Sequence, residues 1–125
     1  MLFDKKPRFI GNNIDVILLT SERTQLNLRE RLERKEDYLA CGELKGGIDP
    51  AGADEHWKTA RSALNRIRSS FAGQTGPCLF FVGAAIEQAM ANEIFAQLES
   101  GRLSYAANFT KPEQLEDLCS WLVEL

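Results

Sequence analysis

The sequence lacks any long apolar run, since no stretch approaches the roughly 20 residues that span a bilayer. Its first residues, Met1 to Lys6, also lack the apolar core of a secretory signal. Repeats, low-complexity linkers and Pro-rich or Gly-rich tracts are missing as well. These absences exclude a helical membrane protein, and we expect a cytoplasmic protein in which residues 1–125 form a single domain.

The sequence contains three cysteines and one histidine. The three cysteines, Cys41, Cys78 and Cys119, stand in apolar surroundings and show no C-x-x-C spacing, so a cysteine-ligated metal site is excluded. We expect all three to be reduced core residues. The only histidine is His56.

An excess of positive charge is also missing. Fifteen Lys and Arg residues face 18 Asp and Glu residues, which gives a net charge of −3. Affinity for nucleic acid depends largely on cations that meet phosphates, so this balance counts against strong binding. Basic residues nevertheless concentrate in two places, residues 23–35 and 58–68.

Hydrophobic periodicity predicts an α/β fold with a mixed central sheet flanked by helices. With 44% hydrophobic residues, a chain of 125 residues can bury a real core. A charged segment of uncertain form, helical or mobile, is expected over residues 20–37. The predicted strands cover residues 13–19, 38–45, 78–83 and 103–109, and the predicted helices residues 54–71, 86–98 and 112–125, with Asp54 as the cap of the first helix.

Two of these strand-like segments contain acids. Asp15 lies within Ile14 to Leu19, and Glu43 follows an apolar run and precedes Leu44 and Lys45. An ionised carboxylate in apolar surroundings costs several kcal/mol unless a cation or hydrogen bonds compensate it. Acids at such positions therefore indicate a functional site, in this case a metal site.

The period of a strand places Glu43 and Lys45 on one face, while Leu44 is expected to turn into the core. If the strand with Asp15 pairs beside them, Asp15, Glu43 and the carbonyl of Leu44 would offer the hard oxygen ligands that Mg²⁺ prefers. Such an ion lowers the pKa of a water, and Lys45 would orient that water. An Asp followed by Glu-x-Lys is the arrangement that hydrolyses phosphodiesters.

Glu-x-Lys alone is weak evidence, because Glu33-Arg34-Lys35 matches it too within a polar run. The alternative for Glu43 and Lys45 is a charged pair at the exposed end of a strand. Glu87 is a further acid, but a carboxylate in a first helical turn is favoured by the helix dipole alone.

The segment from Glu43 to Ala60, ELKGGIDPAGADEHWKTA, resembles the catalytic stretch of Type II restriction endonucleases of the PD-(D/E)XK superfamily, in particular the AvaI/BsoBI group. The interval back to Asp15 is similar as well. One departure is Ile14, which stands where the superfamily name implies a proline. The resemblance implies a restriction-endonuclease-like core with Asp15, Glu43, Lys45 and His56 as catalytic residues.

For His56 the resemblance implies a general base near the attacking water, whereas a lone histidine at the start of a helix otherwise bonds a loop. For Asp49 it implies a contact to a base edge in DNA, such as a cytosine amino group. Ile48-Asp49-Pro50 is also ordinary turn material, and that alternative stays open.

The resemblance further implies Mg²⁺ as cofactor, duplex DNA as substrate, a target of the form C-pyrimidine-C-G-purine-G, a homodimer and a cognate DNA methyltransferase in the same system. Enzymes of this group are longer, with a helical recognition region before the catalytic core that we expect to be absent here. Two alternatives remain. One is a catalytically silent DNA-binding or assembly remnant, and the other is an unrelated α/β interaction domain in which Asp15 and Glu43 lie far apart.

Overall fold

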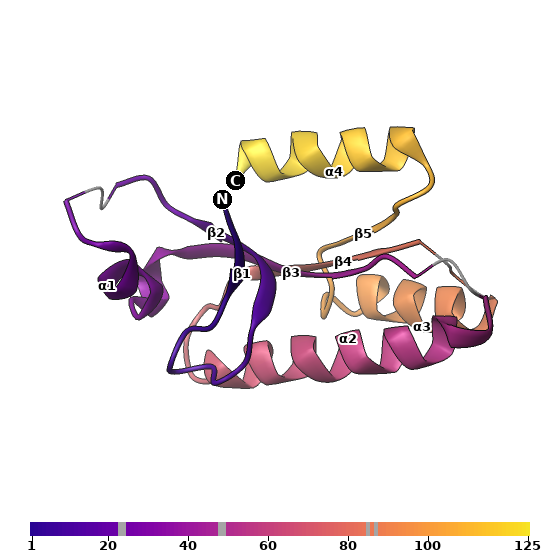
Figure 1. The fold of residues 1–125 in the computed structure, drawn as a ribbon, viewed down its shortest axis with the longest axis horizontal. Helices are drawn as coiled ribbons and strands as arrows, with labels where there is room; N and C mark the ends of the chain where they lie inside the picture. Colours follow the sequence, from indigo (N-terminus) through magenta and orange to yellow (C-terminus); the bar gives the residue numbers. More distant parts are fainter. Residues whose placement is uncertain (23–24, 48–49, 85, 87) are drawn as a thin grey trace.

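The computed structural model describes residues 1–22, 25–47, 50–84, 86 and 88–125. One five-stranded sheet, in the order β1-β2-β3-β4-β5, forms its centre, with helices on both faces (Figure 1). The first two strand pairs are antiparallel and the last two are parallel, which confirms the predicted mixed α/β sheet. The elements are β1 (Leu2–Lys5), β2 (Ile14–Leu19), α1 (Leu28–Leu32), the 3₁₀ helix η1 (Lys35–Asp37), β3 (Tyr38–Lys45), α2 (Pro50–Ser70), β4 (Cys78–Gly83), α3 (Gln88–Glu99), β5 (Tyr105–Asn108) and α4 (Pro112–Glu124).

Helices α2 and α3 cover one face of the sheet, and α4 covers the other (Figure 1). The stripe predicted on α2 is buried as expected, because its spacing of three and four residues places every member on the side that meets the sheet. Its indole, Trp57, is fully buried and packs edge-on against Phe81 of β4. The other buried members of the stripe are Ala60, Leu64, Ile67 and Phe71.

Strand β4 is apolar throughout because both of its faces are covered. Phe81 packs in the core beneath α2 and α3, whereas Phe80 and Val82 pack beneath α4. Helix α2 carries the chain from β3 to the parallel strand β4. The carboxyl ends of these two strands therefore meet at one edge of the sheet, where Lys45 pairs with Gly83.

Several expectations about the elements were wrong. Helix α2 begins at Pro50, so Asp54 lies inside the helix and pairs with Lys58 at 2.9 Å instead of capping it. Proline favours the first helical turn because it has no amide hydrogen to leave unpaired. The helix therefore starts at this proline and not after Asp54, the predicted cap. The strand β1 was not predicted, and the strand expected at residues 103–109 is shorter. The segment from residue 20 to 37 contributes two short helical turns, α1 and η1.

Three side chains expected in the core are not fully buried. Leu44 is 38% exposed, so its side chain is not covered at that point of β3. Cys119 is exposed on α4 and Cys78 is half-buried, so only Cys41 is a fully buried cysteine. Within the described ranges, no helix is long and apolar enough to cross a membrane.

Gly42 is a position at which the sheet tolerates no side chain. A Cβ built there would lie 2.2 Å from the buried ring of Phe80, so the ring would have to move. We expect Gly42→Ala to lower the free energy of unfolding by about 1–3 kcal/mol, the usual cost of overpacking. Urea denaturation measures this change. Gly46→Ala is the matched control, because a Cβ at Gly46 meets nothing within 4 Å, and an equal loss in both variants would contradict the packing argument.

Candidate active site

The two acids lie where the pairing of β2 with β3 ends. Val16 pairs with Gly42, and Asp15 and Glu43 are the next residues on the two strands in the direction of the carboxyl end of β3. Glu43 is two residues beyond Cys41, which packs in the core beneath α2 and α3, so its side chain points toward the layer of these helices.

Each acid accepts a hydrogen bond from the backbone of the other strand. The Asp15 N–H donates to Glu43 Oε2 at 3.0 Å, and the Leu44 N–H donates to Asp15 Oδ2 at 2.8 Å. These bonds continue the strand pairing with side chains in place of carbonyls, and they hold both carboxylates between β2 and β3. The hypothesis that the two acids lie far apart, as an unrelated interaction domain predicts, is therefore wrong.

Glu43 is a buried carboxyl group with only 5% of its surface exposed. Its pKa is raised to about 7, chiefly by burial. The negative charge of Asp15 also raises the pKa, whereas the bond from the Asp15 N–H and the charge of Lys45 lower it. The alternative of a charged pair at an exposed strand end fails for Glu43. A nearby cation would compensate the cost of ionising this group.

The backbone N–H and C=O groups of Leu44 and of Lys45 point to opposite sides of β3. The Leu44 N–H bonds to Asp15, and because the N–H and C=O of one strand residue point the same way, the Leu44 carbonyl also faces β2. The Lys45 carbonyl instead accepts a bond from the N–H of Ala84 at 3.0 Å, which fixes the end of β3 against β4. The Leu44 carbonyl is thus directed toward the acids.

His56 lies on the first half of α2 and packs against the loop that follows β3. A Cβ built on Gly47 would be 2.3 Å from His56 Cε1 and 2.9 Å from Nδ1, so the imidazole rests directly on the Gly47 backbone. This contact brings His56 to the same end of β3 as Lys45, two residues before Gly47. The sequence carried a signal for it in the Gly46-Gly47 pair, although its role as the support of the imidazole was not predicted.

The donor set fits a hard divalent cation. Among the residues described, no three Asp, Glu, His or Cys side chains converge as a metal cluster. Mg²⁺ does not require such a cluster, because it keeps several waters and takes one or two carboxylates together with substrate phosphate oxygens. Asp15, Glu43 and the Leu44 carbonyl provide oxygens of that kind from two adjacent strands.

Asp49 and Glu87 lie outside the described residues, so the structure does not test the base contact expected of Asp49 or the position of Glu87.

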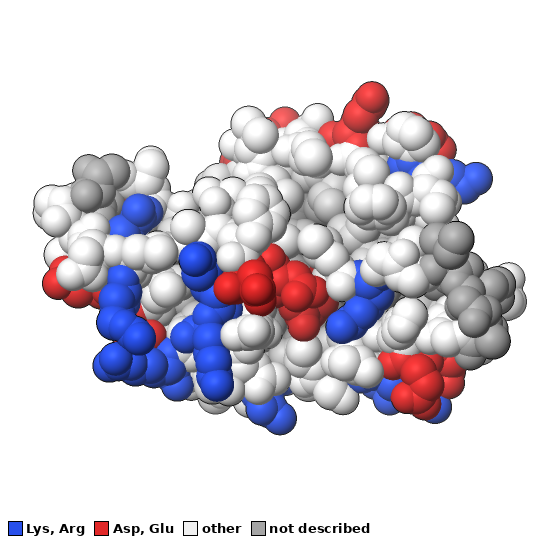
Figure 2. Space-filling model, viewed as in Figure 1, with Lys and Arg blue, Asp and Glu red and all other residues white. Residues whose placement is uncertain are grey.

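The surface around the site has a distinct charge pattern. Acidic side chains gather in the middle of the face seen in Figure 2, over strands β1 to β3, and Lys and Arg side chains lie on either side of them. Basic groups beside an acidic centre suit a polyanion that must be held across it.

Comparison with known proteins identifies the family. A family model described as Restriction endonuclease BsobI matches residues 2–125. The chain is 50% identical over 117 residues to the Type II restriction enzyme AvaI of Nostoc sp. and of Anabaena variabilis, which covers 93% of this chain and 37% of each relative. It is 49% identical over 117 residues to the Type II restriction enzyme BsoBI of Geobacillus stearothermophilus, with 36% of that protein covered. The chain spans little more than a third of these relatives and belongs to the BsobI restriction endonuclease family.

Proposed function

We propose that this chain is the catalytic part of a Mg²⁺-dependent, sequence-specific endonuclease that hydrolyses phosphodiester bonds of duplex DNA. The observation that carries the proposal is the pair of bonds in which Glu43 accepts from the Asp15 N–H and Asp15 accepts from the Leu44 N–H. These bonds hold a buried carboxyl group beside a second acid and the charge of Lys45. The relatives named above are Type II restriction enzymes, which supports this reaction over others that use paired acids.

In this proposal Asp15, Glu43 and the Leu44 carbonyl hold Mg²⁺. When bound, the ion lowers the pKa of a water and neutralises charge on the substrate phosphate. Lys45 donates a hydrogen bond to the attacking water and stabilises the negative charge that develops on the oxygens of the substrate phosphate. The water oxygen bonds to phosphorus, one P–O ester bond breaks, and the leaving oxygen takes up a proton.

His56 is proposed to accept the proton of the attacking water, a role for which an imidazole is suited near neutral pH. Its place depends on Gly47, since any side chain at residue 47 would displace the ring. We expect Gly47→Ala to lower kcat about 10- to 100-fold with little change in KM, because misplacing a catalytic group by about 1 Å costs that much.

Single-turnover and steady-state cleavage of a labelled duplex measure the effect of Gly47→Ala. The Gly46→Ala variant is the control, because its added methyl group meets nothing and leaves His56 in place. If Gly47→Ala cleaves at the wild-type rate, or if both variants fall alike, His56 does not depend on Gly47 as proposed.

The relatives are longer than this chain, so the proposal also covers how the complete enzyme is organised. We propose that residues 1–125 form a single catalytic core, that the helical recognition region of the group lies outside this chain, and that the working form is a homodimer. The proposed location is the cytoplasm, and a cognate DNA methyltransferase would protect the host sequence. The proposed target is C-pyrimidine-C-G-purine-G, with Asp49 as a candidate contact to its bases.

The short coverage of the relatives favours one second candidate, a catalytically silent DNA-binding or assembly remnant. Incubation with Mg²⁺ and two matched duplexes separates the candidates, one with the proposed target and one with its central C-G step inverted. Cleavage restricted to the first duplex supports the endonuclease. Binding of duplex without cleavage at any Mg²⁺ concentration supports the remnant.

A further inference from the structure

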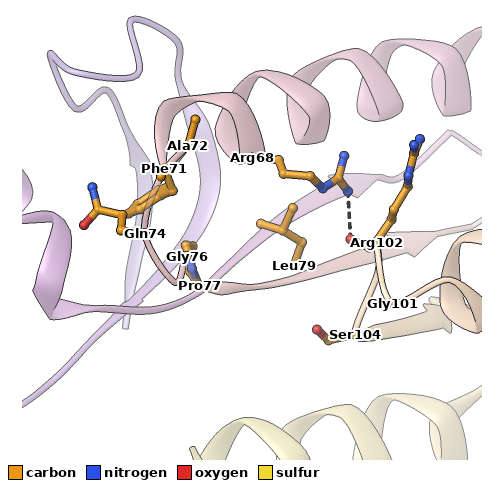
Figure 3. Close-up of a pocket in the computed structure, with 11 residues that line it drawn as sticks. Arg68, Phe71, Ala72, Gln74, Gly76, Pro77, Leu79, Gly101, Arg102 and Ser104 are labelled. Carbon is orange, nitrogen blue, oxygen red and sulfur yellow. Dashed lines mark hydrogen bonds between the residues drawn. The ribbon is translucent and has the colours of Figure 1, made fainter.

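A basic hollow lies at the end of the molecule away from the acids. It has a volume of about 330 Å³ and lies between the end of α2, the segment that leads into β4, and the loop before β5 (Figure 3). Arg68 and His56 sit twelve residues apart on α2, which places this hollow about 18 Å along the helix from the candidate active site. It is therefore a separate feature.

Two arginines meet in this hollow without a compensating acid. Arg68 bonds through one nitrogen to Asn65 at 2.6 Å and through the other to the Arg102 carbonyl at 2.7 Å. Figure 3 shows the two guanidinium groups on the same side of the hollow, next to α2. Burial and the charge of Arg102 both lower the pKa of Arg68, as expected where like charges meet.

The Arg102 guanidinium is available to a ligand. Within the described part of the chain it forms no hydrogen bond or ion pair, and no acidic side chain lines the hollow. Ser104 and Gln74 also line the hollow, with Gln74 at the end away from the two arginines (Figure 3), and Phe71 and Leu79 add apolar side chains. The rim is fixed by the backbone, because the Ser104 N–H donates to the Leu79 carbonyl at 2.8 Å.

We propose that this hollow binds a phosphate group through Arg102 and Arg68, independently of the acidic site. A phosphate presents several acceptor oxygens in different directions, which matches the donors of two neighbouring planar guanidinium groups. The same chemistry is offered by a backbone phosphate of duplex DNA and by a free phosphate or nucleotide. The experiment distinguishes these two sources.

The test is an NMR titration of the ¹⁵N-labelled 125-residue chain in EDTA, so that no cleavage is required. Inorganic phosphate is added at constant ionic strength to wild type, Arg102→Gln and Arg66→Gln. Arg66 is a matched control, because it is an exposed arginine on the same helix that bonds Asn12 and does not line the hollow. Arg102→Gln removes only the guanidinium and keeps the carbonyl that Arg68 uses.

In wild type we expect phosphate to shift the amide signals of residues 72–76 and 101–104. Arg102→Gln should weaken the apparent affinity at least about ten-fold, the effect of losing a charged bidentate contact, and Arg66→Gln should leave it unchanged. A short duplex that shifts the same signals, with the same dependence on Arg102, identifies DNA as the source. Shifts with phosphate alone identify a free phosphate or nucleotide. Absence of shifts with either probe, or equal weakening in both variants, overturns the proposal.

Discussion

Glu43→Gln is expected to reduce the cleavage rate on a target duplex at least about 10³-fold relative to wild type. Glutamine has the shape of glutamate and keeps an oxygen that can accept the bond from the Asp15 N–H, so the local fold should persist. The substitution removes the negative charge that makes the group a strong ligand for Mg²⁺. The loss should therefore fall on the chemical step and leave the structure unchanged.

Cleavage under single-turnover conditions with saturating protein measures this loss, and circular dichroism checks the fold. Asp37→Asn is the matched control, because Asp37 is also a buried acid but lies just before β3, at the end opposite Glu43. We expect it to retain cleavage within a few-fold. Lys45→Met should resemble Glu43→Gln, with a loss of about 10² to 10³. Equal rates in wild type, Glu43→Gln and Lys45→Met would reject the proposed chemistry.

The second large effect concerns stability without metal. The pKa of Glu43 is raised to about 7 in the folded chain, from its ordinary value of 4.5, so the folded state holds this proton more tightly than the unfolded state. The stability that the proton contributes is fully present below pH 4.5 and is lost as pH rises through about 7. In EDTA we expect the wild type to lose on the order of 2–3 kcal/mol of unfolding free energy through this group between pH 4.5 and 8.

Urea denaturation of wild type and Glu43→Gln across this pH range isolates the contribution, because other titrating groups are common to both. The variant should be the more stable protein at pH 8 in EDTA, and the difference should shrink toward pH 4.5. Millimolar Mg²⁺ should stabilise wild type at pH 8 by mass action and leave Glu43→Gln and Asp15→Asn nearly unchanged. Parallel pH curves for wild type and Glu43→Gln would contradict the burial argument, and equal Mg²⁺ effects in all three would contradict the metal site.

The fold was largely predictable from the hydrophobic periodicity. The stripe on α2 and the continuous apolar run of β4 follow from simple geometric periods, and each lies where its pattern predicts. Strand β1 escaped prediction because Leu2–Lys5 is short and mostly exposed, so pairing with β2 decides its structure more than its own composition does. Leu44 was placed wrongly because alternation along a strand gives the face but not whether anything covers that face.

The sequence predicted which residues form the site better than it predicted the contacts between them. Asp15 and Glu43 stand out in the sequence because acids are unusual in apolar strands, and the structure brings the two together. The reciprocal bonds to backbone N–H groups and the resting place of His56 on Gly47 depend on the register of β2 with β3 and on where α2 begins. The hydrophobic pattern gives the buried face of each strand, but residues 20–37 separate β2 from β3, so no tight turn fixes the register between them.

The central claim is that Asp15 and Glu43 jointly hold one divalent cation, and anomalous diffraction from crystals of the wild-type chain grown with Mn²⁺ tests it most directly. We predict a single strong peak within about 2–2.5 Å of one oxygen from each carboxylate, and no peak at this place in Asp15→Asn crystals grown alongside. A wild-type map with Mn²⁺ bound elsewhere and nothing between these two side chains would contradict the account.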